Sequence, residues 1–90
     1  MLYMIVERFK PDAAPEIYRR ARTRGRQLPP GLEYVDSWVD LTYTRCFQLM
    51  RTEEPALFEK WINAWADLVD FEVIPVRTSS EATQAIAPKL

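Results

Sequence analysis

The segment YVDSW at residues 34–38 carries the side chains of this chain that are best suited to chemistry. Side chains two positions apart on a β-strand point to the same face, so the spacing predicts that Tyr34, Asp36 and Trp38 lie together. A carboxylate between two aromatic rings loses hydration, which raises its pKa and makes Asp36 a candidate catalytic acid or base. Arg45, expected on the neighbouring strand, would pair with Asp36 or bind an anionic group of a ligand. The alternative is a purely structural aromatic interface that contains an Asp–Arg pair.

The amino-acid composition limits the other catalytic and metal-binding groups that the chain can provide. The chain contains no histidine, which removes the commonest general base and the commonest metal ligand. The only cysteine, Cys46, has no histidine partner, so we expect a buried structural thiol in a reducing, cytoplasmic environment. Two glycines, Gly25 and Gly31, are too few for a glycine-rich phosphate loop, and the acidic residues lack metal-ligand spacing. We therefore expect neither a cofactor nor a metal.

The arginine-rich stretch RRARTRGR at residues 19–26 suggests nucleic-acid binding at first sight. The chain, however, has 12 basic and 13 acidic residues and a formal net charge of −1, whereas nucleic-acid-binding proteins usually carry a basic surplus. On a helical wheel Arg19, Arg20, Arg22 and Arg26 lie away from the apolar residues. We therefore interpret the stretch as the solvated side of a helix, and we do not expect a nucleic-acid partner.

Hydrophobic patterning predicts one domain over residues 1–90. Strands are expected at 2–9, 32–41, 44–51 and 71–78, and helices at 14–28 and 57–69, with a short C-terminal helix that Ser79 or Ser80 would cap and Pro88 would end. A short connection at residues 40–42 predicts a hairpin. The order β-α-β-β-α-β is ferredoxin-like, an α+β fold in which two helices cover one face of a four-stranded antiparallel sheet.

Two helices leave the second face of the sheet open. Tyr3 and Ile5 are expected on this open face if Leu2, Met4 and Val6 pack beneath the helices. The other strands are expected to add Tyr34, Asp36 and Trp38, with Val35 and Val39 beneath the helices, and either Phe47 and Leu49 or Cys46 and Met50. Because a monomer rarely exposes so large an aromatic patch, we expect a homodimer that pairs through the open sheet face.

Four segments, MLYMIVERFK, YVDSWVD, RCFQLM and WINAWADLVDFEVIPV, resemble a family of short proteins known as domain of unknown function 3303. Such proteins resemble the dimeric α/β-barrel group, in which two ferredoxin-like sheets pack face to face around a cavity. The resemblance implies the fold and the dimer, and it implies no catalytic residues. The group includes cofactor-free oxygenases, lactone isomerases and haem-degrading enzymes, and the last of these normally need a histidine that this chain lacks.

The sequence thus predicts a small cytoplasmic homodimer that binds a small apolar or aromatic molecule between the paired sheets. The expected pocket residues are Tyr3, Tyr34, Asp36, Trp38 and Arg45. Three alternatives stay open: a cofactor-independent monooxygenase or isomerase, an interaction dimer without a ligand, and an RNA-binding sheet that stacks bases on Tyr3 and Phe47. No membrane partner is expected, because the first apolar run stops at Glu7.

Overall fold

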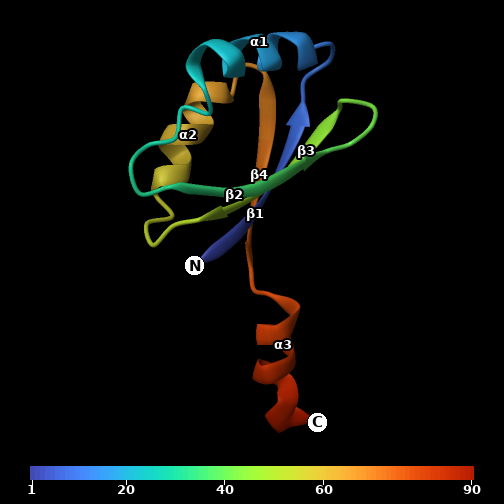
Figure 1. Cartoon of the computed structure of the whole chain (residues 1–90), viewed down its shortest axis with the longest axis vertical. Helices are drawn as coiled ribbons and strands as arrows, with labels where there is room; N and C mark the ends of the chain where they lie inside the picture. Colours follow the sequence, from blue (N-terminus) through green and yellow to red (C-terminus); the bar gives the residue numbers. More distant parts are fainter.

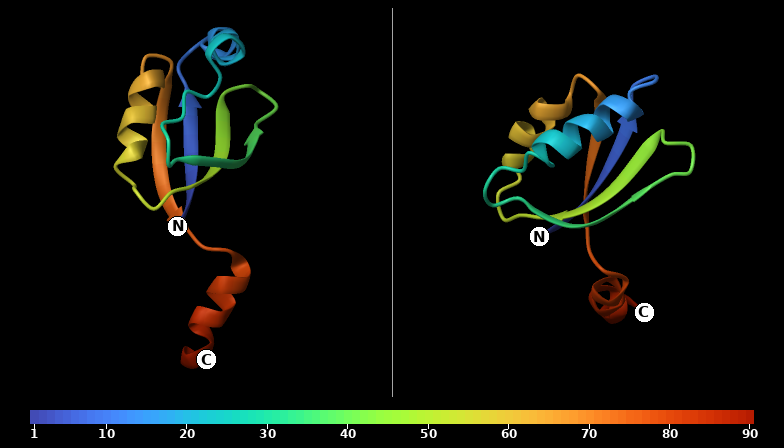
Figure 2. Two further views of the ribbon diagram at one scale, coloured as in Figure 1. Left: turned by 60° about the vertical axis from the view of Figure 1, so that its left-hand side comes forward. Right: turned by 45° about the horizontal axis from the view of Figure 1, so that its top comes forward.

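A computed structural model covers residues 1–90 and confirms the ferredoxin-like α+β fold (Figure 1). The antiparallel strands form one sheet in the order β2-β3-β1-β4, and helices α1 and α2 lie on the same side of it (Figure 2). The elements are β1 (Leu2–Phe9), α1 (Ala14–Arg24), β2 (Glu33–Val39), β3 (Arg45–Arg51), α2 (Leu57–Trp65), β4 (Val69–Val76), α3 (Ser79–Ile86) and a 3-10 turn, η1 (Ala87–Lys89).

Both main helices are shorter than the sequence pattern predicts. Helix α1 ends at Arg24 instead of residue 28, because Gly25 adopts a φ of 66° that takes the chain out of the helix. The amide of Gly25 still donates to the carbonyl of Ala21, which closes the last turn. Helix α2 ends at Trp65, and β4 begins two residues earlier than predicted. An irregular segment, residues 25–32, therefore links α1 to β2 and runs along helix α2, whose Trp61 and Trp65 donate to the carbonyl of Arg26.

The hydrophobic core lies between the sheet and helix α2. Ile5 and Met50, from the two adjacent central strands, are completely inaccessible to solvent. Tyr3 packs edge-on against Phe58 of α2, with ring centroids 5.0 Å apart. Edge-to-face packing of this kind is favourable for aromatic pairs, so it fixes α2 on the sheet.

The face of β1 that packs against the helices is the opposite of the predicted one. Tyr3 and Ile5 point toward the helices, and Leu2, Met4 and Val6 lie on the open face. Strand β3 follows one of the two expected arrangements, with Phe47 and Leu49 on the open face. Alternation divides a strand into two sets of side chains, but it does not specify which set the helices cover.

Strand β2 contains an irregularity that changes the predicted site. The pairing register shifts between Tyr34, which is opposite Met50, and Asp36, which is opposite Leu49. A β-bulge adds a residue to one strand, so residues two apart across it no longer share a face. Tyr34 therefore lies on the covered side with Met50, whereas Asp36 and Trp38 lie on the open face. The prediction that all three share one face is wrong.

Helix α3 projects away from the domain (Figure 1), and none of its residues is buried. Its N-terminus is capped by Thr78, not by Ser79 or Ser80: the Thr78 hydroxyl accepts from the Glu81 amide, and the Glu81 carboxylate accepts from the Thr78 amide. This reciprocal capping box stabilises the first turn. No helix in the structure is both long enough and apolar enough to span a membrane.

Candidate functional site

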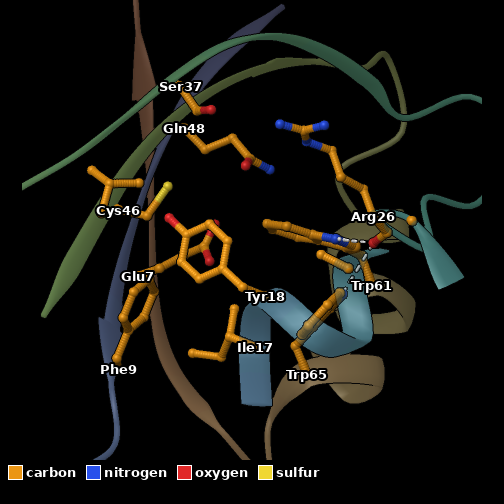
Figure 3. A pocket seen from close by; sticks show the side chains of 13 residues that line it. Glu7, Phe9, Ile17, Tyr18, Arg26, Ser37, Cys46, Gln48, Trp61 and Trp65 are labelled. Atoms are coloured by element: carbon orange, nitrogen blue, oxygen red, sulfur yellow. Dashed lines mark hydrogen bonds between the residues drawn. The ribbon is translucent and has the colours of Figure 1, made fainter. Parts of the chain in front are cut away.

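A pocket of about 270 Å³ lies between α1 and the covered face of the sheet (Figure 3). It forms because the short helix α1 presents the small residues Ala21 and Gly25 to the sheet and then ends. Most of its lining is apolar, and the polar groups are few. The lining residues are Glu7, Phe9, Ile17, Tyr18, Ala21, Gly25, Arg26, Ser37, Val39, Cys46, Gln48, Trp61 and Trp65.

Strand register explains why polar side chains meet in this pocket. Glu7 on β1 is opposite Cys46 on β3, and Cys46 is opposite Val39 on β2. The adjacent row places Gln48 opposite Ser37. Directly opposed side chains of antiparallel strands lie about 5 Å apart at Cβ, so these two rows bring a carboxyl, a thiol, an amide and a hydroxyl group together.

Glu7 is the most unusual group in the pocket. The residue is only 9% exposed, and its carboxyl group forms no hydrogen bond or ion pair within the chain. Burial raises the pKa of Glu7 from 4.5 to about 7, although the positive charge of Arg26 opposes part of this effect. Near neutral pH the carboxyl group is therefore divided between its acid and its ionised form, and it can both donate and accept a proton.

Cys46 and Gln48 extend the polar floor of the pocket beside Glu7. As predicted, Cys46 is buried; burial and the charge of Glu7 raise its pKa to about 12, so the thiol stays protonated. The side-chain amide of Gln48 donates to the sulfur of Met50 at 3.4 Å, and its oxygen makes no hydrogen bond. Nowhere do three His, Cys, Asp or Glu side chains gather as metal ligands.

Arg26 lies at the opposite end of the pocket (Figure 3). Its backbone carbonyl accepts hydrogen bonds from the indole nitrogens of Trp61, at 3.1 Å, and Trp65, at 3.0 Å. Its guanidinium group lies 3.6 Å from the centre of the Tyr34 ring. The prediction that Arg26 lies on a helix is wrong, because α1 ends at Arg24. The residue is exposed to solvent, as predicted, and its side chain also lines the pocket.

The two tyrosines of the predicted site lie on the covered side of the sheet. Tyr3 is 5% exposed and belongs to the core, so it lines no cavity on the open face. Tyr34 hydrogen-bonds through its hydroxyl to Oγ of Ser37 at 2.7 Å, and its ring supports Arg26. Tyr34 thus belongs to the surroundings of the pocket, although not for the reason that the sequence suggested.

The other predicted site residues lie on the open face and do not form the expected group. Asp36 is exposed and accepts a hydrogen bond from the amide of Ser37 at 2.8 Å. Trp38 is 52% exposed. Arg45 pairs with Asp40 at 3.2 Å and not with Asp36. Hydrogen bonds from the backbone of the following strand and from Arg45 hold the pKa of Asp40 well below its usual range.

The sequence contains a signal for Glu7 that the motif-based reading missed. Tyr3, Ile5 and Phe9 alternate on one face of β1, and Glu7 occupies a place in this otherwise apolar series. A charged residue within an apolar alternation is expected to cost folding free energy. Glycine at position 25, one residue before Arg26, is likewise a common helix-stop signal.

Two comparisons with known proteins complete the description of the site. The family model described as "Domain of unknown function (DUF3303)" matches residues 1–90. A search of curated proteins finds no match. The family match confirms the resemblance seen in the sequence, and the family description names no activity.

Proposed function

Because this chain belongs to the DUF3303 family, whose description assigns no activity, we propose from the site itself that the protein binds a small, largely apolar molecule in the pocket beneath α1. The observation that carries the proposal is the buried Glu7 carboxyl group without a partner in the chain. The Glu7 carboxyl group has lost most of its hydration without gaining a partner in the chain, which is unfavourable for folding. Groups of this kind cluster at functional sites, where a ligand supplies the missing contact.

The lining favours an aromatic ligand. Phe9, Ile17 and Trp61 supply apolar surface, and most of the polar groups gather on the sheet side of the pocket (Figure 3). Ligand sites commonly combine a mostly apolar lining with a few placed polar groups. The proposal keeps the small apolar or aromatic ligand predicted from the sequence. It moves that ligand from between two sheets to the interior of one subunit.

Titration of the ¹⁵N-labelled chain with p-cresol tests the proposal. We expect shifts at the amides of Cys46 and Gln48 and at the indole of Trp61, because all three line the pocket. Glu7→Gln should weaken binding by ~10-fold, the effect of one hydrogen bond to a charged or acidic group. Glu72→Gln is the matched control, because Glu72 lies on the open face and pairs with Arg8.

Two results would contradict the binding proposal. One is the absence of saturable shifts at millimolar p-cresol. The other is a set of shifts confined to open-face residues such as Trp38 and Phe47, which would return the site to the predicted cavity between subunits. Equal effects of Glu7→Gln and Glu72→Gln would remove Glu7 from the ligand contacts.

A second candidate function is proton-transfer catalysis in the same pocket. It is favoured by the pKa of Glu7, which burial raises to about 7, near the value at which a general base works best at neutral pH. This chemistry suits a cofactor-independent isomerase, or a monooxygenase that deprotonates its substrate. Deuterium exchange at the acidic C–H of an aryl 1,3-diketone measures it. The rate should rise as pH passes through 7 in the unmodified protein and lose this rise in Glu7→Gln.

We also propose that the open sheet face pairs with a second copy of the chain, in the cytoplasm. The support is the apolar surface of this face, where Trp38 is about half exposed and Ile74 about a third exposed. Exposing such surface to water is unfavourable, and a second copy of the chain would cover it. Trp38→Lys should shift sedimentation velocity toward the monomer. Leu41→Lys, at the exposed tip of the β2–β3 hairpin, should not. A dimer that binds no p-cresol would favour the alternative of an interaction unit without a ligand.

The RNA-binding alternative loses one of its two stacking residues. It required Tyr3 and Phe47 to stack bases from the open face. Tyr3 instead packs against Phe58 in the core. The remaining ring, Phe47, lies beside Arg45, whose charge is already paired with Asp40, so we do not retain this function.

A further inference from the structure

Arg26 is held in place from three directions. Its carbonyl accepts the indole N–H groups of Trp61 and Trp65, at 3.1 and 3.0 Å, which fixes the backbone above helix α2. Its guanidinium plane is supported by the Tyr34 ring at 3.6 Å. Tyr34 is itself fixed, because its hydroxyl is hydrogen-bonded to Ser37 at 2.7 Å. A long side chain held in this way loses less entropy when it binds a ligand.

The guanidinium group of Arg26 nevertheless forms no hydrogen bond or ion pair in the chain. Arg20, six residues earlier, shows the contrast: its two terminal nitrogens donate to the two carboxylate oxygens of Asp67 at 2.9 and 2.7 Å. Arg26 thus offers a free planar set of donors at the wall of the pocket. This fork matches the two oxygens of a carboxylate.

The pocket therefore has two unlike polar ends. Arg26 provides fixed positive charge at one end, and Glu7 provides an unpaired carboxyl group at the other (Figure 3). The ring of Trp61 projects into the space between them, and Ile17 adds apolar lining on the α1 side (Figure 3). A volume of about 270 Å³ is small for a ligand site, so the occupant is a small molecule that reaches both ends.

Building on the proposed binding function, we propose that the ligand is a small aromatic carboxylic acid with a hydroxyl group on the opposite side of its ring. The carboxylate binds the guanidinium group of Arg26, and the hydroxyl group hydrogen-bonds to the carboxyl group of Glu7. The ring lies against Trp61. A carboxylate matches the free planar donors of Arg26, which water otherwise hydrates. The hydroxyl group can donate to the ionised carboxylate of Glu7 or accept from its protonated form.

Three probes with the same ring separate this ligand class from the general proposal. We would measure binding of 4-hydroxybenzoate, p-cresol and 4-hydroxybenzylamine by isothermal titration calorimetry. We expect the protein to bind 4-hydroxybenzoate with ~10-fold or more higher affinity than p-cresol, because the carboxylate adds one charge-assisted hydrogen bond. The cationic amine should bind most weakly, because Arg26 repels it.

Arg26→Gln should abolish the higher affinity for 4-hydroxybenzoate and change the affinity for p-cresol by no more than about twofold. The substitution keeps the backbone carbonyl to which Trp61 and Trp65 donate, so it spares the anchoring of this segment. Arg22→Gln, on the exposed side of α1 and outside the pocket lining, is the matched control and should change neither affinity.

The outcomes distinguish two kinds of failure. Tightest binding of the amine, or an undiminished preference for 4-hydroxybenzoate in Arg26→Gln, would overturn the ligand class and leave the pocket as a binding site. Failure of all three probes to bind the unmodified protein would overturn the proposed binding function as well.

Discussion

Arg8 and Glu72 form an ion pair at 3.2 Å on the open face of the sheet, whereas Glu7, the neighbour of Arg8 on the covered face, has no partner. The same contrast holds elsewhere. Arg45 pairs with Asp40 on the open side, and Cys46, the next residue, lines the pocket. Successive residues of one strand therefore have opposite electrostatic environments.

The two faces of the sheet differ because the open face is in contact with solvent and the covered face is not. An exposed charge is hydrated whether or not it is paired, so a surface ion pair contributes little and also costs little to lose. The Glu7 carboxyl group keeps only a small contact with solvent in the pocket, so the loss of most of its hydration disfavours its charged form. The sequence predicts a site at residues 34–38 because of their residue types and spacing. The proposed site rests instead on an unpaired carboxyl group on the covered side of the sheet.

The largest expected effect is on the free energy of unfolding, and it differs between Trp61 on the covered side of the sheet and Trp38 on the open face. Trp61→Ala should lower the free energy of unfolding by ~3–5 kcal/mol, because a large buried ring is removed. Trp61 is 3% exposed and also donates to the carbonyl of Arg26. Trp38→Ala, at a half-exposed position, should change the monomer by less than ~1 kcal/mol. Urea unfolding followed by circular dichroism at low protein concentration measures both, and equal losses would remove the distinction between the faces.

The pH dependence of stability tests the unpaired carboxyl group of Glu7. Its pKa rises from 4.5 to about 7 on folding, so between these values the folded chain binds the proton more tightly than the unfolded chain. The contribution of Glu7 is most favourable below the lower pKa and falls by ~3 kcal/mol as pH rises through the higher one.

Urea unfolding on both sides of this pH window measures the effect. Glu7→Gln should flatten the decline, because glutamine does not titrate. Glu72→Gln, which changes a paired carboxylate on the open face, should leave the decline in place. A decline that persists in Glu7→Gln would assign the effect to another group.

The smallest effect is expected on the open face. Arg8→Gln removes an ion pair whose two side chains are each about half exposed, so we expect a loss of ~0.5 kcal/mol or less. High salt should reduce this loss further, because it screens exposed charges. Unfolding at low and high ionic strength measures it, and a salt-insensitive loss as large as that of Trp61→Ala would contradict the contrast between the faces.

The element order was predictable from the sequence, because the changes between alternating and helical patterning are local signals. The choice of face was not, because Tyr3 and Met4 are both apolar and only the packing of α2 decides between them. The register shift beside Tyr34 leaves no mark in residue type. Arg26 was misplaced because a helical wheel assumes that the helix continues through Gly25. The pocket combines these three non-local features, which explains why its members were largely missed.

Helix α3 has a consequence for local opening of the chain. Its capping box orders the first turn, yet no residue of the helix is buried, so its opening does not disturb the core. Its backbone amides should exchange with deuterium by local fraying, while amides beside Ile5 and Met50 should exchange only through global unfolding. We therefore expect α3 to open independently of the core. An interaction that buries α3 against another molecule would appear as slowed exchange in this helix, before any change in the core.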